Sequence, residues 1–281
     1  MALRRSLYKS PAQLRAMIRP GTITADALAA VRAIVAPGVT TLELDAEASR
    51  VIRSAGARSN FQLVRGYRHT VCTSVNEQVV HGIPGPRVLQ AGDILSVDAG
   101  AEFEGWNGDS AFTIVLPDPA RPDVVTEREE LSRVTEGSLW AGIAALATAR
   151  HLGEVGAAIE GHIEQASAQS GRSYGILQDY VGHGIGRKMH EAPPVFNYRV
   201  SDRGPEVRPG LVVAIEPMVV SGDPATLVED DEWTVSTLDG SAGSHWEHSV
   251  AVHDGGLWVL TAPDGGAAGL APFGVTPAPI S

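Results

Sequence analysis

The chain has 281 residues, enough to bury a core as one large domain or as two closely packed halves. Its 33 acidic and 22 basic residues give a formal net charge of -11, which disfavours broad binding to nucleic acid phosphates. The only cysteine, Cys72, excludes an intramolecular disulfide. No apolar stretch approaches membrane-spanning length, and the first residues are not followed by a signal-peptide core, so we expect a cytoplasmic protein without membrane attachment.

Two helices are predicted at the start of the chain. Ser10, followed by Pro11 and Gln13, has the pattern of a helix N-cap with a capping box. Pro20 should break or kink this first helix, because proline cannot donate a backbone hydrogen bond. Thr40 with Glu43 predicts the start of a second helix, which should end near residues 55–56.

A predicted hairpin over residues 93–113 carries one aspartate on each strand. Period-two alternation gives Asp98 and Asp109 small neighbours on their own faces. With the turn at residues 104–105, antiparallel pairing brings the two opposite or nearly opposite each other, within a residue or two. Carboxylates so close need a shared proton or a cation. The alternative is that both are solvated residues on a polar sheet face.

After a proline-rich linker at residues 117–122, the order helix, helix, strands begins again. Thr126 and Glu129 are predicted to cap a helix that ends near Ala149, a shorter helix covers residues 154–169, and strands follow to residue 260. This order predicts an α+β fold with an internal pseudo-two-fold axis, in which repeats of about 10–117 and 124–260 form one domain over residues 1–261. Residues 262–281, rich in glycine, alanine and proline, are expected to be a loosely packed tail.

Further polar groups follow in the second half. His183 and His190 lie in a glycine-rich run, where the backbone can pass close to a ligand. Glu216 ends an apolar run typical of a buried strand, so its charge needs a proton, an arginine or a metal. Glu247 shares its strand face with small residues, although an exposed polar face would explain it equally well. Together these groups suit one or two divalent cations such as Mn, Fe, Co or a catalytic Zn pair.

At this point the chain resembles the bacterial type I methionine aminopeptidases of the pita-bread metallopeptidase superfamily, from about residue 10 to about residue 260. The resemblance rests on ordered blocks: Ser74-Val-Asn-Glu77 leading to His81-Gly-Ile-Pro84, then Asp98 and Asp109, Gly182-His183-Gly-Ile-Gly186 with His190-Glu191, Pro209-Gly210 to Ile215-Glu216-Pro-Met218, and Glu247-His248. It implies a pita-bread fold with a curved antiparallel sheet between two helix-helix-strand halves.

The resemblance also implies the chemistry. It makes Asp98, Asp109, His183, Glu216 and Glu247 the ligands of two divalent metal ions (Co, Mn, Fe or Zn), with Asp109 and Glu247 bridging. A metal-bridging hydroxide would attack the first peptide carbonyl, and Glu216 would handle its proton. His190 would stabilise the oxyanion, and His81 would assist at the scissile amide. The substrate's free α-amino group would coordinate a metal, which explains cleavage at the chain end only.

The predicted methionine pocket is where the match weakens. Tyr67, Cys72 and Trp233 correspond to family positions that line it. Val64, Arg65, Arg68 and Met189 replace an aromatic residue, a histidine, a proline and a phenylalanine that are common in the family. These departures leave the metal ligands intact but bear on substrate preference.

The resemblance implies a cytoplasmic exopeptidase, a monomer, that removes initiator methionine before a small second residue. Its partner would be the N-terminus of a nascent polypeptide or peptide, with a transient ribosome contact and neither a specific nucleic acid nor a membrane. A proline-specific exopeptidase such as aminopeptidase P or prolidase, which uses the same ligands, is one alternative. A non-catalytic binding protein on the same fold is another. A non-haem iron oxygenase using His81, Asp98 and His183 is a third.

Overall fold

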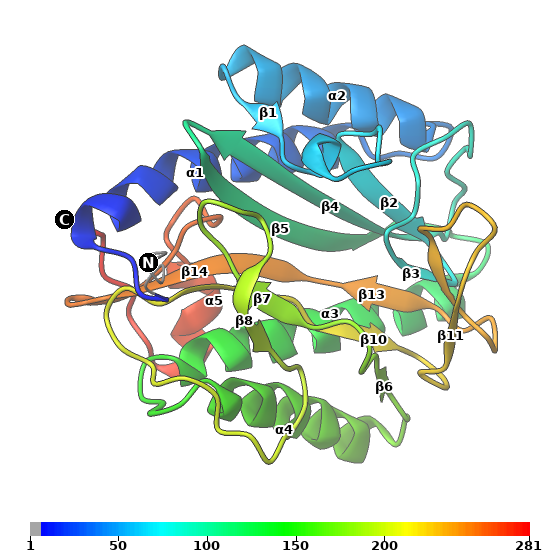
Figure 1. Ribbon diagram of the computed structural model, residues 1–281. Coiled ribbons are helices and arrows are strands. Elements are labelled where there is room, and N and C mark those ends of the chain that lie inside the picture. The colour runs from blue at the N-terminus through cyan, green and yellow to red at the C-terminus, as the bar shows by residue number, and fades with distance from the viewer. Residues whose placement is uncertain (1–6) are drawn as a thin grey trace.

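The computed structural model describes residues 7–281. The expectation that the chain has no signal peptide was drawn partly from residues 1–6, which lie outside the described residues. A nine-stranded antiparallel sheet runs through the middle in the order β1-β4-β5-β14-β9-β7-β8, with β2 paired to β4 and β15 to β14. The helices α1 and α2 cover one side of the molecule, and α3 and α4 cover the other (Figure 1). This is the expected α+β architecture, whereas the division into two repeats and one domain stays a prediction.

The helices and strands have the following bounds. The helices are α1 (Pro11–Ile34), α2 (Thr41–Ser54), η1 (Phe61–Leu63), α3 (Pro122–Ala145), α4 (Gly153–Ser170), α5 (Ala267–Leu270) and η2 (Ala271–Phe273). The strands of the first half are β1 (Arg58–Ser59), β2 (Val71–Val75), β3 (Gln78–Val80), β4 (Ile94–Phe103) and β5 (Trp106–Val115). Those of the second half are β6 (Gly175–Ile176), β7 (Gly182–Gly184), β8 (Glu191–Val195), β9 (Val212–Ile215), β10 (Met218–Val220), β11 (Thr226–Val228), β12 (Val235–Thr237), β13 (Gly243–His245), β14 (Glu247–His253) and β15 (Gly256–Val259).

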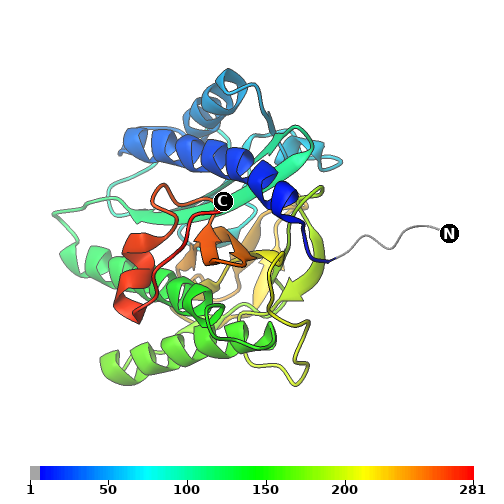
Figure 2. The same cartoon turned by 90° about the vertical axis from the view of Figure 1, so that its left-hand side faces the viewer.

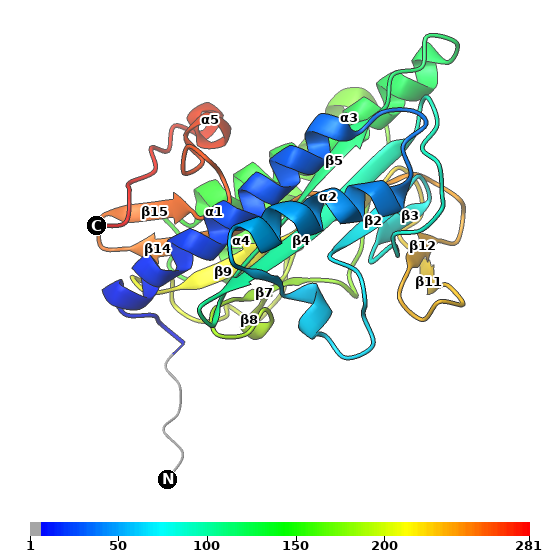
Figure 3. The ribbon, with the colours of Figure 1, turned by 90° about the horizontal axis from the view of Figure 1, so that it is seen from above.

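Helices α1 and α2 begin where their capping boxes predict, at Ser10 and Thr40. Of the two outcomes expected at Pro20, a break is wrong, because α1 continues through the proline, whereas a kink stays a prediction. Tertiary contact explains this result: a side chain at Gly21 would collide with the backbone of Leu260, so the proline turn is held tightly against the sheet. Figure 3 shows α1 and α2 lying along β4 and β5.

Helix α3 begins five residues earlier than predicted, with its N-cap at Arg121 instead of Thr126. Pro122 lies in its first turn, and Thr126 sits inside the helix, where its hydroxyl donates to the carbonyl oxygen of Pro122 at 2.9 Å. The capping signal at Thr126 and Glu129 was therefore wrong, since a proline in the first turn starts a helix as well as a side-chain cap does. The helix also ends earlier than predicted, at Ala145 rather than near Ala149.

The β4–β5 hairpin forms as predicted, with its turn at Glu104 and Gly105, both at positive φ. Its register pairs Asp109 with Gly100 and Asp98 with Ala111, so the two aspartates are diagonal neighbours. On the other face of β4, Val97 packs into the apolar core below α1 and α2. Both aspartates therefore point into the interior of the molecule.

The first part of the C-terminal segment is packed more closely than the expected loose tail, whereas none of residues 271–281 is buried. Leu270 is fully buried in the core that α3 and α4 cover, and the backbone of Ala278 bonds to Leu257 at 2.9 Å and to the ring of His253 at 2.7 Å. Figure 2 shows this segment running along the molecule beside α3 and α1. Its glycines allow close packing: a side chain at Gly269 would collide with the ring of Trp140. None of the helices in residues 7–281 is long and apolar enough to cross a membrane.

Candidate metal and substrate site

One cavity of about 170 Å³ is lined by every residue that the sequence predicted to bind metal or substrate. Those residues are Tyr67, Cys72, His81, Asp98, Asp109, His183, Met189, His190, Glu216, Trp233 and Glu247. Phe61 and Val64 complete the lining. Phe61 was not predicted as a site residue. The one feature of the sequence that could have indicated it is its position shortly before Val64, Arg65 and Tyr67, which were assigned to the methionine pocket.

The acidic side chains come from strands that meet in the central sheet. Pairing of β4, β5 and β14 places Ala111 directly between Asp98 and Glu247. The small alanine side chain leaves room for both carboxylates on one face. Glu216 follows the last residue of β9, as the proline after it predicted, and its side chain is 13% exposed. Asp98, Asp109 and Glu247 are buried, so a solvated polar face is excluded.

Three of these groups already lie at the spacing of metal ligands. Three possible ligand atoms, one each from Asp109, His183 and Glu247, lie within 4.8 Å of one another. The Nε2 atom of His183 lies 3.4 Å from an Oε atom of Glu216. Asp98 is close enough that its charge helps to raise the pKa values of Asp109, Glu216 and Glu247.

The electrostatics of this cluster call for a cation. Burial raises the pKa of Asp98 to about 8, and burial followed by mutual repulsion raises the pKa values of the other three carboxyl groups. One oxygen each of Asp98, Asp109 and Glu247 is buried without a hydrogen-bond partner among the described residues. Within residues 7–281, the only ion pairs of Glu216 are with histidines, so the arginine alternative is excluded. These orphaned oxygens fit divalent metal ions.

His183 turns its Nε2 atom toward the carboxylates of the cluster. Its Nδ1 atom lies 3.0 Å from the carbonyl oxygen of Gly184, which orients the ring when Nδ1 carries the proton. Burial, followed by the charge of His190, lowers the pKa of His183 to about 4. A neutral imidazole with Nε2 turned to the carboxylates is the form that binds a metal.

Two further histidines border the cavity. His81 follows β3 at a positive φ of 61°, and its ring meets that of Tyr180 edge-on with centroids 5.7 Å apart. Its pKa is lowered to about 4 by burial, followed by the charge of His190. The ring of His190 lies 4.4 Å from that of His183, and burial lowers its pKa as well. The imidazoles of His81 and His190 are therefore neutral at pH 7, and each can donate one hydrogen bond.

An apolar wall closes the other side of the cavity. Tyr67, Cys72 and Phe61 form a buried cluster, against which Met189 and Trp233 pack. The hydroxyl of Tyr67 donates to the carbonyl oxygen of Val71 at 2.6 Å and lies 3.2 Å from the sulfur of Cys72. Its ring meets the indole of Trp233 edge-on, with centroids 5.1 Å apart. The predicted side-chain pocket is thus an aromatic slot in which hydrogen bonds and ring contacts hold Tyr67 in place.

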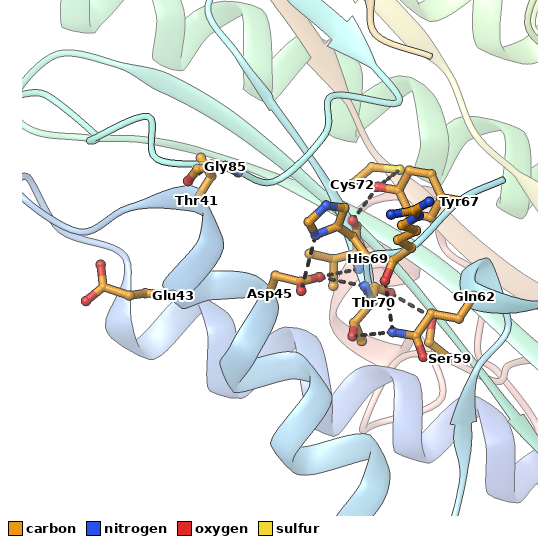
Figure 4. Close-up of polar contacts among 12 residues, drawn as sticks. Thr41, Glu43, Asp45, Ser59, Gln62, Tyr67, His69, Thr70, Cys72 and Gly85 are labelled. Atoms are coloured by element: carbon orange, nitrogen blue, oxygen red, sulfur yellow. Dashed lines mark hydrogen bonds and ion pairs between the residues drawn. The ribbon is translucent and has the colours of Figure 1, made fainter. Parts of the chain in front are cut away.

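Asp45 on α2 anchors this slot and was not predicted from the sequence. One of its oxygens accepts hydrogen bonds from the backbone N–H groups of Thr70 at 2.6 Å and Val71 at 3.1 Å. The other lies 3.5 Å from the Nδ1 atom of His69 (Figure 4). Asp45 therefore holds the loop that carries Tyr67, although in sequence it is only one more acidic residue on an amphipathic helix.

His245 is a second residue that the sequence reasoning missed. Its ring is buried, and its Nε2 atom lies 3.8 Å from an oxygen of Glu216 without a hydrogen-bond partner among the described residues. Burial, followed by the charge of His81, lowers its pKa to about 3. Period-two spacing could have found it, because His245 lies two residues before Glu247 and shares its face.

Residues 15–254 match the model of metallopeptidase family M24. The chain belongs to this family. It is 46% identical over 254 residues to methionine aminopeptidase 1 of Mycobacterium tuberculosis, covering 90% of this chain and 94% of that one. It is 38% identical to methionine aminopeptidase 1 of Bacillus subtilis, covering 91% of this chain and 98% of that one.

Solved structures agree on the fold. The methionine aminopeptidase of Thermotoga maritima superposes with a TM-score of 0.83 at 35% identity, over 90% of this chain and 98% of that one. The prolidase of Pyrococcus furiosus, at 18% identity and a TM-score of 0.69, shares the fold over 91% of this chain and only 65% of its own length. The pita-bread fold is therefore confirmed. Membership in a metallopeptidase family makes the chain a hydrolase that uses divalent metal ions, against the oxygenase alternative.

Proposed function

We propose that this protein is a methionine aminopeptidase, which hydrolyses the first peptide bond of chains that begin with methionine. The observation that carries the proposal is the meeting of five ligand-type side chains from both halves of the chain beside one aromatic slot. Relatives of nearly full length are named methionine aminopeptidases.

The residues that would hold the two divalent metal ions are Asp98, Asp109, His183, Glu216 and Glu247. Bound metal ions supply Lewis acidity and lower the pKa of water, which allows hydrolysis at neutral pH. The protein contributes the fixed positions of the ligands. Because one oxygen each of Asp98, Asp109 and Glu247 is buried without a hydrogen-bond partner among the described residues, that oxygen can ligate a metal ion without breaking a hydrogen bond.

The remaining polar groups act on the substrate and its protons. Glu216 holds a proton readily, because burial, followed by the charge of Asp98, raises its pKa. His190, neutral at pH 7, would donate a hydrogen bond to the carbonyl oxygen of the first residue as negative charge develops there. His81, also neutral, would contact the scissile amide and support its leaving nitrogen.

The aromatic slot would accept the methionine side chain. Methionine is unbranched and flexible, and its thioether makes favourable contacts with ring edges such as those of Tyr67 and Trp233. Met189, the departure from the usual phenylalanine, keeps this wall apolar and makes it more adaptable. The slot lies beside the ligand cluster, so it positions the first peptide bond at the metal ligands.

The physiological setting is part of the same proposal. The enzyme would act in the cytoplasm as a monomer, on initiator methionine followed by a small residue, with at most a transient contact to the ribosome. It would bind neither a specific nucleic acid nor a membrane. The Gly/Ala/Pro-rich residues 262–281 would serve as a packed C-terminal extension of a single catalytic domain.

The test is a peptide panel that varies the first two residues, assayed with Mn²⁺, Co²⁺, Fe²⁺ and Zn²⁺. Release of methionine from Met-Ala and Met-Gly peptides, with little release from Met-Leu peptides, is expected. Leu-Ala peptides serve as the control for the first position. Cleavage of Xaa-Pro peptides with no release of methionine would instead support a proline-specific exopeptidase. A chain that binds none of these metals and releases no residue from any peptide of the panel would support a non-catalytic binding protein.

A further inference from the structure

A second hollow of about 420 Å³ opens directly beside the catalytic cavity. The two share Val64, Met189 and His190 as a common wall. The other side is formed by β1, by the tip of the β4–β5 hairpin and by residues 187–188 of the loop between β7 and β8. Figures 1 and 3 both show the hairpin tip and the β7–β8 loop on the same side of the molecule. We call this hollow the basic groove.

The floor of the basic groove is firmly built. The backbone N–H and the side-chain amide of Asn107 both donate to the carbonyl oxygen of Gly186 at 3.0 Å. Arg187 donates to the carbonyl oxygens of Glu104 and Gly105 at 3.0 and 3.1 Å. Its guanidinium carbon lies 4.0 Å from the ring centroid of Trp106. These contacts fix a cation at the groove without cancelling its charge.

The charges of the groove do not balance. Arg58 is neutralised by Glu102, whose Oε2 atom accepts from it at 2.5 and 2.9 Å. The nearby Glu191 pairs with Lys9 at 3.0 Å. The backbone N–H of Lys188 donates to an oxygen of Glu191 at 3.0 Å, but within residues 7–281 neither the guanidinium of Arg187 nor the ammonium of Lys188 forms an ion pair, so two positive charges remain on the groove wall. Glu104 is exposed on the hairpin turn and is not part of the lining. This positive groove stands out on a chain of net charge -11.

We propose that the basic groove binds the peptide beyond its second residue and that Arg187 and Lys188 select a carboxylate there. The inference rests on the proposed function, because it needs the first residue in the aromatic slot. A peptide whose first carbonyl contacts His190 has reached the wall that the cavity and the groove share, and an extended chain advances about 3.3 Å per residue from there. The third and fourth residues therefore enter the groove. The carboxylate is an aspartate or glutamate side chain, or the C-terminus of a short peptide.

The experiment measures kcat/KM for the amidated peptides Met-Ala-Asp-Asp-Ala, Met-Ala-Gln-Gln-Ala and Met-Ala-Lys-Lys-Ala with the metal-loaded enzyme. Two exposed charge contacts predict a preference for the aspartate peptide over the lysine peptide of about fivefold. The preference should shrink between low salt and 0.5 M NaCl, because salt screens charges beyond a few ångströms. Met-Ala-Ala as free acid and as amide tests the C-terminal carboxylate separately.

The variant Lys188→Glu should abolish or reverse the ratio of kcat/KM between the aspartate and lysine peptides. Arg203→Glu, which makes the same charge change on an exposed loop outside the groove, should leave this ratio unchanged. Equal kcat/KM values for the three peptides, or a ratio that Lys188→Glu does not alter, would overturn the inference while methionine release persists. If no peptide releases methionine, the proposed function itself fails.

Discussion

Asp109 is a single residue whose surroundings demand a cation. It is 3% exposed, one of its oxygens has no hydrogen-bond partner among the described residues, and Asp98 and Glu216 repel its charge. Such a carboxylate is stable in its charged form only beside a metal ion. Asp109 lies on β5 of the first half, and its backbone N–H donates to the hydroxyl of Ser249 on β14 of the second half at 3.1 Å. It therefore lies where the two halves of the molecule meet.

Asp109→Ala should therefore abolish both metal binding and activity. We expect no detectable Mn²⁺ or Co²⁺ uptake by calorimetry and a loss of kcat of at least about a thousandfold, because one of the proposed metal ligands is gone. Asp26→Ala, at an exposed site on α1, is the control for loss of one aspartate. A wild-type rate in Asp109→Ala would contradict the assignment of the ligands.

His190→Ala should separate catalysis from metal binding. The imidazole touches the ring of His183 but belongs to the substrate side of the cavity, so its removal leaves the ligand set whole. We expect a fall in kcat of about a hundredfold, as for loss of one oxyanion donor, with metal affinity within a few fold of wild type. His190→Gln, which keeps a donor, should recover part of the rate. Loss of metal together with loss of rate would make His190 a ligand instead.

At the scale of the element, the loop over residues 60–70 shapes the substrate slot from a distance. Asp45 holds its end through two backbone hydrogen bonds, and the same loop carries Tyr67 and Val64 into the cavity. The helix α2 thus determines where the aromatic slot lies, although none of its residues lines the cavity.

Asp45→Ala should raise KM for Met-Ala peptides about tenfold, since two buried N–H groups lose their acceptor at a cost of about 1–2 kcal/mol. The value of kcat and the metal affinity should stay close to wild type, because the ligands lie on other elements. Asp45→Asn keeps an acceptor oxygen and should retain a lower KM than the alanine variant. Equal losses of kcat and metal affinity would show that Asp45 acts on the whole fold rather than on the slot.

Local signals predicted the elements that carry the site. The capping boxes at Ser10 and Thr40 and the turn at Glu104 act within a few residues, so the sequence alone placed α1, α2 and the β4–β5 hairpin. Alternation along β4 and β5 then predicted which way Asp98 and Asp109 point. The register between them needed the structure, because alternation cannot tell a direct partner from a diagonal one.

Predictions failed where distant contacts override local preference. Pro20 stays helical because Gly21 lets α1 pack closely on the sheet. The glycines near the C-terminus predicted a loose tail, but the ring of Trp140 packs directly against Gly269, where a side chain would collide with it. Asp45 could not be recognised, since its partners lie about 25 residues further along the chain. The family resemblance, and not the spacing of residues, predicted that side chains from the two halves line one cavity.

At the scale of the whole molecule, the ligand cluster ties stability to metal and pH. The pKa of Asp98 is about 8 in the folded protein against 3.8 for the free group, and burial raises the pKa values of its neighbours too. A raised pKa means that the folded state holds protons which the unfolded state has already lost. The stability that this gives is complete at low pH and is lost as the pH rises through the folded pKa.

The metal-free protein should therefore lose thermal stability between about pH 7 and pH 8, the upper part of the interval between the unfolded and folded pKa values of Asp98, and the contribution of Asp98 should level off above it. The buried histidines have lowered pKa values and do not add to the slope there, because they are neutral in both states above about pH 7. Differential scanning calorimetry in EDTA should show a falling Tm. With saturating Mn²⁺ the Tm should be higher and nearly independent of pH. A Tm in EDTA that does not change with pH would contradict the claim that the buried carboxylates repel one another.

The central claim is that five converging side chains hold divalent metal ions which drive removal of N-terminal methionine. Its most direct test follows free methionine released from a Met-Ala-Ser peptide by the metal-stripped enzyme, while Mn²⁺ or Co²⁺ is added in measured steps. The account predicts no release without metal and a rate that rises with each addition until the ligands are filled. Full activity in the presence of a strong chelator, or no methionine at any metal concentration, would contradict it.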